Sequence, residues 1–303
     1  MRTVVARHVV ACGLISRDMS IGRVAELWRY PVKSMAGESR REVSLTSFGI
    51  PGDRGWAVRD EQRAAIVGGK KLAGLMRCSA RYLEEPREQS SAPAEITLPD
   101  GSTLHTGDPD VSARLSAALE RTVTLWPLLS ADARDHFRRG MPDNPDLEAE
   151  LRSIFGRTPD EPLPDLSVFP PELFEFESLP GTYFDAFPLL LVTRASLSSL
   201  QSLATTSTID VRRFRPNLVL ETENGDGFPE SAWIGRSLRV GSAVVEVLID
   251  CPRCVMITHE FDDLRREPEI MRTLVREHGG NFGVYARVAE AGTVRCGDSI
   301  EIL

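Results

Sequence analysis

The chain has 303 residues, of which 42% are apolar, and it carries a formal net charge of −8 at pH 7. This length exceeds what a single hydrophobic core usually supports, so we expect two domains. The acidic balance argues against a broad nucleic-acid-binding surface, because phosphate backbones are bound by clustered lysines and arginines. A local basic pocket for one small anion is still compatible with this composition.

The sequence contains no stretch close to the ~20 consecutive apolar residues of a membrane helix. Its five cysteines, an odd number in a chain long for a disulfide scaffold, favour a reducing compartment. We therefore expect a cytoplasmic protein with no membrane and no nucleic-acid partner. The first apolar stretch is interrupted by Arg7 and His8, which argues against a secretory signal, and residues 1–19 are expected to be a disordered extension.

Residues 20–130 consist of short apolar stretches separated by Gly, Pro and Asp, a pattern typical of a β-barrel or sandwich. One helix is predicted among them, beginning at Asp110 and carrying Val111, Leu115 and Leu119 on one face. The expected strands lie near residues 24–30, 42–46, 56–58, 82–83, 96–98 and 122–126.

Residues 131–185 are rich in Pro, Asp and Arg, and we expect a helical or irregular connection there. One helix is predicted within it, with Asn144 as the N-cap, Pro145 at the first helical position and Gly156 at the end. Its apolar side chains are Leu147, Leu151, Ile154 and Phe155.

Residues 186–303 return to strands, with helices predicted to begin near Thr193 or Ser196 and near Pro268. The expected strands lie near residues 189–192, 217–220, 238–240, 244–249, 284–288 and 299–303. The predicted fold class is therefore mainly β with some helix, in two β-rich domains joined by the connection.

Two short motifs in the first half are candidates for phosphate binding. In WRYPVKSMAG, residues 28–37, Lys33 and Ser34 follow a strand stopped by proline, and a cation beside a hydroxyl suits a phosphate oxygen. In PGDRGW, residues 51–56, Arg54 follows a turn, and Asp53 is placed to hold it. The alternatives are a solvated lysine and a surface ion pair.

A third motif, RRFRPN at residues 212–217, contains three arginines in four positions. On a strand, Arg213 and Arg215 would share one face and suit a clustered anion. The alternative is a charged edge strand that blocks aggregation.

The fourth motif is CPRC, Cys251 to Cys254, at the end of an apolar run. A thiol here could be a soft metal ligand, a redox partner or buried filler, that is, an inert side chain that only packs in the core. The last alternative also suits Cys78. A structural zinc needs about four ligands, for which His259 and Cys296 are the obvious supplements. A thioredoxin-like pair needs a helix start, whereas residues 255–258 look extended.

Taken in order, YPVKS, GDRGW, RFRPN, CPRC and GNFGVYARV (residues 280–288) resemble the MOSC family. The similarity is greater to its subgroup with an N-terminal MOSC β-barrel domain, which includes the mitochondrial amidoxime-reducing component and its bacterial relatives. The resemblance runs from Met19 to near the end of the chain. It implies a β-barrel-like domain at residues 20–130 and a MOSC β-barrel domain at residues 186–303.

The resemblance also implies a molybdenum cofactor, a molybdopterin that holds the metal. In the family the protein ligand of the metal is the second cysteine of CPRC, which corresponds to Cys254. The phosphate contacts of family members correspond to Lys33, Ser34 and Arg54, and further pocket positions to Arg215 and Asn217. Both assignments agree with the chemistry of the residues, because arginine forks bind phosphate and a thiolate suits a soft metal.

The activity implied is a molybdenum-dependent oxidoreductase that reduces N-hydroxylated small molecules or transfers an oxygen atom, with Cys254 as the catalytic metal ligand. No four-cysteine cluster occurs up to Leu303, so we expect an external electron donor: a ferredoxin, a cytochrome b5-like protein or a flavin reductase. The alternative is a non-catalytic cofactor carrier related to the C-terminal part of molybdenum cofactor sulfurases.

Ser231 departs from the family pattern, where an acidic residue is common. We expect the cofactor in the cleft between the two β-rich halves.

Overall fold

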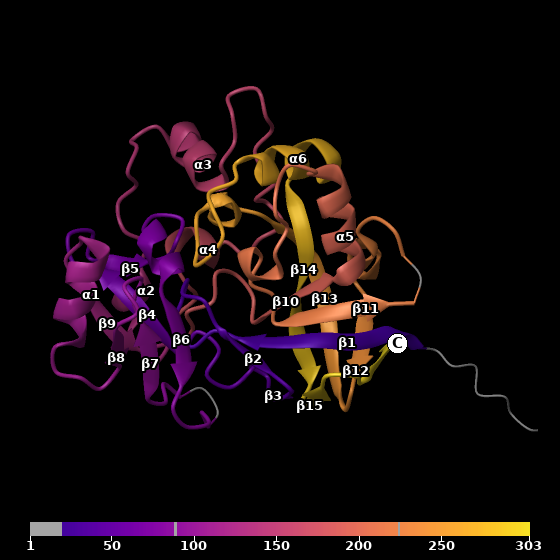
Figure 1. Cartoon of the computed structure of the whole chain (residues 1–303), viewed down its shortest axis with the longest axis horizontal. Helices are drawn as coiled ribbons and strands as arrows, with labels where there is room; N and C mark the ends of the chain where they lie inside the picture. The colour runs from indigo at the N-terminus through magenta and orange to yellow at the C-terminus, as the bar shows by residue number, and fades with distance from the viewer. Residues whose placement is uncertain (1–19, 88–89, 224) are drawn as a thin grey trace, which may run out of the picture.

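The structure is a computed structural model, and it describes residues 20–87, 90–223 and 225–303. The expected disordered extension at residues 1–19 lies outside the described residues. The predicted fold class is confirmed, since most of the regular structure consists of strands, and the helices lie around the sheets (Figure 1).

The largest sheet closes on itself as a seven-stranded barrel, because its first and last barrel strands are also paired with each other. All neighbours are antiparallel except β10 and β11, which are parallel. The strand order around the barrel is β1 (Ser20–Arg29), β11 (Leu218–Thr222), β10 (Leu189–Thr193), β14 (Asn281–Glu290), β13 (Ala243–Pro252), β12 (Ser237–Val240) and β16 (Ser299–Ile302).

Strand β1 closes this barrel, although it belongs to the range predicted as the N-terminal domain. Gly22 pairs with Thr222 on one side and with Ile300 on the other. A Cβ at Gly22 would collide with the carbonyl oxygen of Glu221, so the close pairing requires glycine. The sheets therefore do not follow the predicted domain ranges, because periodicity locates a strand but not its partners.

Two short additional pairings tie the halves together along the same edge. Strand β2 (Glu38–Arg40) pairs with β1, and β3 (Glu42–Leu45) pairs with β15 (Gly292–Arg295). The inward faces of the barrel strands form one apolar core that includes Val24, Leu27, Leu191, Leu220, Val245, Val284 and Ile300.

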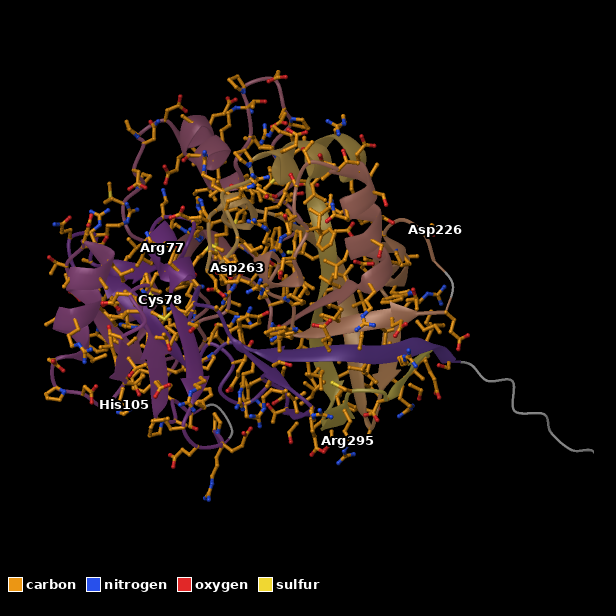
Figure 2. The ribbon with its side chains drawn as sticks, viewed as in Figure 1. Arg77, Cys78, His105, Asp226, Asp263 and Arg295 are labelled. Atoms are coloured by element: carbon orange, nitrogen blue, oxygen red, sulfur yellow. The ribbon has the colours of Figure 1, made fainter. Side chains whose placement is uncertain are left out.

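The N-terminal part beside the barrel contains two three-stranded sheets and helix α1 (Val111–Leu119). The helix begins after Asp110 as predicted, and Leu115 is fully buried in the core between the sheets. Cys78 is 1% exposed in the same core, as expected for buried filler (Figure 2). The sheets are β5 (Ala65–Val67), β4 (Trp56–Asp60) and β9 (Val123–Pro127), and β6 (Ser79–Tyr82), β7 (Ala94–Thr97) and β8 (Thr103–His105).

The connection contains α2 (Arg134–Phe137), α3 (Leu147–Phe155) and α4 (Glu172–Glu175). Helix α3 ends at Gly156 as predicted, in the left-handed conformation. The predicted cap was wrong, because the Asp146 side chain, and not Asn144, accepts hydrogen bonds from the N–H groups of Glu148 and Ala149. Asn144 instead accepts from the N–H of Asp146, so it caps the preceding turn.

Helices α5 (Arg194–Leu203) and α6 (Glu269–His278) lie against the outside of the barrel (Figure 1). Thr193 caps α5 as expected, and Gly279 ends α6. No helix in the described part of the chain is both long and apolar enough to cross a membrane.

Two segments expected to be extended are short 3-10 helices. Residues 255–258 form η4 (Val255–Thr258), and the RRFRPN motif begins with η2 (Val211–Arg213). Further 3-10 turns are η1 (Ala73–Arg77) and η3 (Pro229–Trp233). Both expectations were wrong because apolar or charged runs this short have no reliable period, and the backbone is set by tertiary contacts.

We predict that Leu27→Ala lowers the free energy of unfolding by about 2–5 kcal/mol, because Leu27 is 0% exposed inside the barrel. Urea denaturation followed by circular dichroism measures the effect. Val168→Ala is the control, since that side chain is 51% exposed and should change stability by less than about 0.5 kcal/mol. Equal unfolding midpoints for the two variants would contradict the role assigned to β1.

Candidate functional site

A cavity of about 550 Å³ lies between the barrel, the N-terminal sheets and the connection. Four of the residues predicted from the sequence line it: Arg54, Arg215, Asn217 and Cys254. The remaining two, Lys33 and Ser34, are not among its lining residues. Lys33 contacts Asp185, which lines the cavity, and Ser34 contacts Gly69, which precedes the lining residue Lys70. Residues from both halves of the chain therefore meet at one cavity, as expected.

Three of the predicted residues have an uncommon backbone conformation. Ser34, Arg54 and Arg215 have φ angles of 68°, 52° and 57°. Non-glycine residues with positive φ are uncommon and cost roughly 1–3 kcal/mol, and they gather at ligand sites. In the described residues only three other non-glycine residues share this conformation, namely Ala64, Glu120 and Asp262. Tight turns thus position the basic side chains of the site.

One buried carboxylate, Asp53, organises the basic residues. It forms an ion pair with Arg54 and accepts hydrogen bonds from the Tyr30 N–H at 2.8 Å and from Asn217 Nδ2 at 3.0 Å. The Tyr30 ring contacts both guanidinium groups, with Arg54 Cζ 4.5 Å and Arg215 Cζ 4.3 Å from its centroid. The expectation that Asp53 holds Arg54 is confirmed, and a surface ion pair is excluded because both side chains are buried.

Arg215 carries a buried charge that the protein only partly satisfies. It is 6% exposed and donates one hydrogen bond to the carbonyl oxygen of Met35, while its Nε and Nη2 atoms have no partner. Burial, followed by the nearby charge of Arg54, lowers the pKa of the Arg215 guanidinium to about 10. Buried N–H groups without acceptors are costly. Their position at the cavity indicates an anionic ligand.

The neighbouring Arg253 repeats this arrangement at the other side of the site. It donates to Cys251 Sγ at 3.0 Å and to the carbonyl oxygen of Phe214 at 2.8 Å, and its buried Nε has no partner. Like Arg215, it lines the cavity. Sequence reasoning missed this role for Arg253, although the residue lies inside the CPRC motif.

Lys33 lies behind the cavity wall and is 1% exposed, which excludes a solvated lysine. Its Nζ donates to Asp185 Oδ1 at 2.8 Å, to the carbonyl oxygen of Tyr183 at 3.0 Å and to Ser178 Oγ at 3.2 Å. Burial lowers the pKa of Lys33, and Asp185 opposes this shift. Ser34 Oγ accepts a hydrogen bond from the Gly69 N–H at 2.9 Å and so fixes the adjoining loop.

Asp185 and Glu177 are acidic residues of the site that the sequence did not reveal. The Asp185 side chain is 45% exposed and lines the cavity. Burial by itself would raise the pKa of the Asp185 carboxyl, but the charge of Lys33 and its hydrogen bond lower the pKa well below its usual value. Both residues lie in the irregular connection, where no periodicity or motif marks them.

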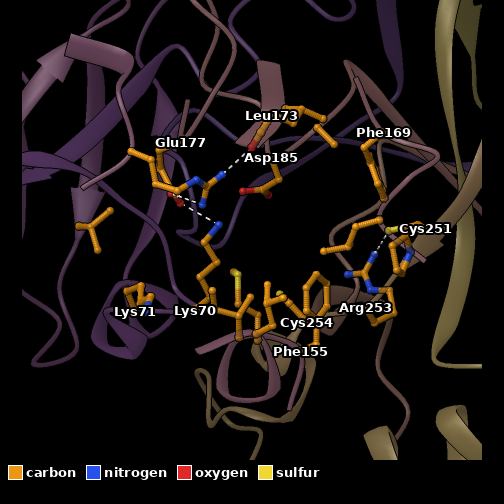
Figure 3. Close-up of a pocket in the computed structure, with 18 of the residues that line it drawn as sticks. Lys70, Lys71, Phe155, Phe169, Leu173, Glu177, Asp185, Cys251, Arg253 and Cys254 are labelled. Atoms are coloured by element: carbon orange, nitrogen blue, oxygen red, sulfur yellow. Dashed lines mark hydrogen bonds and ion pairs between the residues drawn. The ribbon is translucent and has the colours of Figure 1, made fainter. Parts of the chain in front are cut away.

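Glu177 forms ion pairs with Lys70 Nζ at 2.7 Å and with Arg139 Nη1 at 2.8 Å (Figure 3). Burial raises the pKa of the Glu177 carboxyl, but the charges of Lys70 and Arg139 outweigh it, so the pKa is lowered. All three residues line the cavity. The charged side chains on the wall formed by the N-terminal sheets and the connection are therefore paired with each other, whereas Arg215 is not fully paired.

The two cysteines of CPRC have different surroundings, and neither forms a disulfide. Cys251 also borders the cavity, but it is only 1% exposed and packs in an apolar core, where burial raises the pKa of its thiol. Cys254 is partly buried, lines the cavity and caps η4 (Figure 3). The geometry therefore makes the second cysteine the more accessible thiol.

The expectation that Arg213 and Arg215 share one strand face was wrong. Arg213 ends η2, and its guanidinium donates to backbone carbonyl oxygens, including His259 at 2.9 Å and Arg265 at 2.7 Å. Arg212 instead forms ion pairs with Asp210, Asp262 and Asp263. The left-handed turn at Arg215 separates it from both. An edge strand is excluded too, because residues 212–217 do not form a strand.

Ser231, which departs from the family pattern, does not line the cavity. Its hydroxyl donates to Asp250 Oδ1 at 2.6 Å, on the outside of the barrel wall. Ser231 thus acts in the contact between η3 and β13.

We predict that Asp53→Asn destabilises the protein by about 3–5 kcal/mol, because it leaves the buried guanidinium of Arg54 without its ion-pair partner. Arg215→Met is the matched control. It removes the poorly paired charge and should cost less than Asp53→Asn or even stabilise the protein.

Chemical denaturation of both variants, with and without added phosphate, measures these effects. Phosphate should stabilise the wild type, through binding to the folded state, but not Arg215→Met. A wild-type unfolding midpoint for Asp53→Asn would contradict the assigned role of this carboxylate.

Two models of known protein families match this chain. The family model described as MOSC N-terminal beta barrel domain matches residues 21–135, and the one described as MOSC domain matches residues 179–301. Among solved structures, the YUAD protein from Bacillus subtilis aligns over 93% of this chain and 94% of its own, with a TM-score of 0.41 and 11% identity.

Curated relatives align over nearly the whole chain. Mitochondrial amidoxime reducing component 2 of Bos taurus is 26% identical over 310 residues, covering 94% of this chain and 84% of that protein. Molybdenum cofactor sulfurase of Drosophila mojavensis is 27% identical over 304 residues, covering 92% of this chain but only 35% of that protein. This chain thus spans about a third of the sulfurase. The two domain matches follow the order of the two halves of the molecule, and the chain belongs to the MOSC family, in the subgroup with a MOSC N-terminal β-barrel domain.

Proposed function

We propose that the protein is a molybdenum-cofactor-dependent oxidoreductase that reduces N-hydroxylated small molecules. The observation that carries the proposal is the pairing of two features in one cavity: the unpartnered N–H groups of buried Arg215 and the accessible thiol of Cys254. The first suits an anion and the second a soft metal. Relatives named amidoxime reducing component, aligned over 94% of the chain, support the choice of this reaction class.

The residues present fit a pterin cofactor that carries a phosphate group and a metal. Arg215 and Arg54 would hold the phosphate, because guanidinium groups donate two parallel hydrogen bonds to its oxygens. Asn217 would keep Arg54 in place, since its Oδ1 lies 3.5 Å from Arg54 Nη1. Cys254 would ligate the metal. Lys33 and Ser34 would act from behind the cavity wall. Lys33 would hold Asp185 in place, and Ser34 would hold the loop at Gly69.

The chemistry supplied by the bound cofactor is two-electron transfer coupled to transfer of an oxygen atom. Reduction of an N-hydroxyl group breaks the N–O bond, consumes two electrons and two protons, and releases the oxygen as water. This chain's residues would bind and orient both groups, with Arg215 neutralised by the phosphate. The enclosing walls would exclude bulk water, which strengthens the electrostatic contacts inside.

A second function, a non-catalytic cofactor carrier, is favoured by one observation. The sulfurase of Drosophila mojavensis aligns with 92% of this chain. A carrier would use the same anion and metal contacts without turnover, so the two functions differ in reactivity and not in binding.

We predict that Cys254→Ala abolishes the reduction of benzamidoxime, because it removes the thiol that faces the cavity. Cys251→Ala should be milder, since that thiol lies in the core against Arg253. Molybdenum analysis and a benzamidoxime assay of protein from a molybdenum-replete host measure both effects. Equal loss in both variants, together with bound zinc, would contradict Cys254 as the molybdenum ligand.

We also propose that the electrons come from a separate donor, such as a ferredoxin, a cytochrome b5-like protein or a flavin reductase. The formal charge of −8 would favour a donor with a basic contact surface. The molybdenum-loaded protein should be inert with NADH or NADPH alone and active with dithionite-reduced viologen. Steady turnover with NADH alone would contradict an external donor, and no turnover under strong reduction would favour the carrier.

A further inference from the structure

A buried guanidinium without a counter-charge lies just beyond the end of α3, in the segment 136–178 that neither family model covers. Arg157 is 6% exposed, and its Nη1 donates to the carbonyl oxygen of Phe155 at 2.8 Å and to Met271 Sδ at 2.7 Å. Its Nε and Nη2 atoms are buried and have no partner, and no carboxylate of the described residues forms an ion pair with it. A buried charge in this state is unfavourable, so stability does not explain its presence.

The carboxylate that follows Arg157 in the chain is already in use. Glu161 forms an ion pair with Arg272 and accepts a hydrogen bond from the Thr158 N–H at 2.8 Å. Burial lowers the pKa of the Arg157 guanidinium; the charge of Glu161 opposes this shift, and that of Arg272 adds to it. A thiolate at Cys254 is the other negative charge that favours the charged guanidinium.

Backbone contacts place this guanidinium behind the CPRC motif and not in the cavity. A Cβ on Gly280 would collide with Arg157 Nη2, so the guanidinium lies directly against this glycine. The carbonyl oxygen of Gly280 in turn accepts a hydrogen bond from the Arg253 N–H at 2.9 Å. On the other side, a Cβ on Gly156 would lie 3.5 Å from the Cα of Val255 in η4. Since Arg157 does not line the cavity, its charge lies behind the second cysteine of the motif.

A buried cation at this position has a defined effect on a metal-bound thiolate. Reduction adds negative charge to the metal and its sulfur ligand, and a nearby positive charge stabilises that added charge. Screening by water and salt is weak because Arg157 is buried, and no carboxylate neutralises it. Groups behind a metal ligand tune the metal in this way without touching it.

We propose that Arg157 is a positioning residue that holds its positive charge behind the metal-binding sulfur of Cys254 and thereby raises the reduction potential of the metal. The inference rests on the proposed ligation by Cys254, and it adds a determinant of the potential that lies in the connection. The unpartnered nitrogens follow from this role, since a carboxylate partner would cancel the charge. The competing explanation is structural, with Arg157 only capping the end of α3 through its hydrogen bond to Phe155.

Potentiometric titration of the molybdenum-loaded protein, followed by electron paramagnetic resonance, measures the proposed effect. Arg157→Met keeps an unbranched side chain but removes the charge. The equilibrium constant for one-electron reduction should then fall about tenfold, which corresponds to a midpoint potential about 59 mV lower. Arg157→Lys keeps the charge and should restore most of the wild-type potential.

Two controls separate the loss of charge from structural damage. Arg287→Met also removes an arginine, but that side chain is 61% exposed, paired with Glu246 and absent from the cavity lining, so the potential should not change. In urea denaturation Arg157→Met should be no less stable than the wild type, because it removes an unpaired buried charge. A marked loss of stability with an unchanged potential would show that Arg157 is structural and would overturn the proposal. Arg157→Gln, also neutral, replaces the methionine variant if that protein does not fold, and failure of both to fold would likewise overturn it.

The potential is measured without substrate, so this inference and the proposed function can fail separately. A wild type that holds molybdenum but reduces no benzamidoxime, with a lower potential in Arg157→Met, would refute the reductase and support the role of Arg157. Normal turnover with equal potentials in the two proteins would retain the reductase and overturn that role. A wild type that binds no molybdenum in a molybdenum-replete host would overturn both.

Discussion

The carboxylate of Asp53 is the contact on which the site depends. It lies on a turn of the first half, and it binds Arg54 beside it and Asn217 just before β11 in the second half. Asn217 in turn accepts a hydrogen bond from the Leu190 N–H at 3.1 Å and donates its own N–H to the carbonyl oxygen of Leu190 at 2.8 Å. One acidic side chain thus connects the turn, the Arg54 guanidinium and, through Asn217, the two parallel barrel strands. Because it is fully buried, its charge acts at short range with little screening.

The charges around the cavity are not balanced at its floor. On the wall formed by the connection, each carboxylate is paired with cations, as in Glu177 with Lys70 and Arg139. At the floor, Asp53 is paired with Arg54, whereas Arg215 has no carboxylate partner and keeps unpartnered N–H groups. This arrangement lowers the stability of the unliganded protein and favours the binding of an anion, since a buried guanidinium without an acceptor is unfavourable until an anion binds.

Much of the fold could be predicted from the sequence because local patterns determine it. The helices at Asp110, Thr193 and Pro268 begin where their capping residues and apolar faces indicate, and most strands follow alternation or apolar runs. The strand partners could not be predicted, since the pairing of β1 with β11 and β16 depends on contacts between distant segments. The conformations of the short segments η2 and η4 were predicted wrongly for the same reason, since they too depend on contacts between distant segments.

The site residues divide in a similar way. Arg54, Arg215, Asn217 and Cys254 lie in compact motifs, and the fold brings all four to one cavity. A motif does not show the direction of a side chain, so the position of Lys33 behind the wall, bound to Asp185, could not be foreseen. Asp185 and Glu177 come from irregular parts of the connection, where neither spacing nor composition marks a residue for a role.

The closure of the barrel by β1 also sets an order of events during folding. Gly22 pairs with Thr222 and Ile300, so the first barrel strand cannot find its partners until the last has been synthesised. Contacts this distant in the chain form slowly, and an unpaired strand is exposed in the meantime. The sheets of residues 56–127 pair among themselves and bridge only to Val32 and Ala36 among the described residues, so they can form earlier. Arg215 and Asn217, which precede β11, reach their final positions when the barrel closes. The anion-binding floor is thus among the last parts of the molecule to be completed.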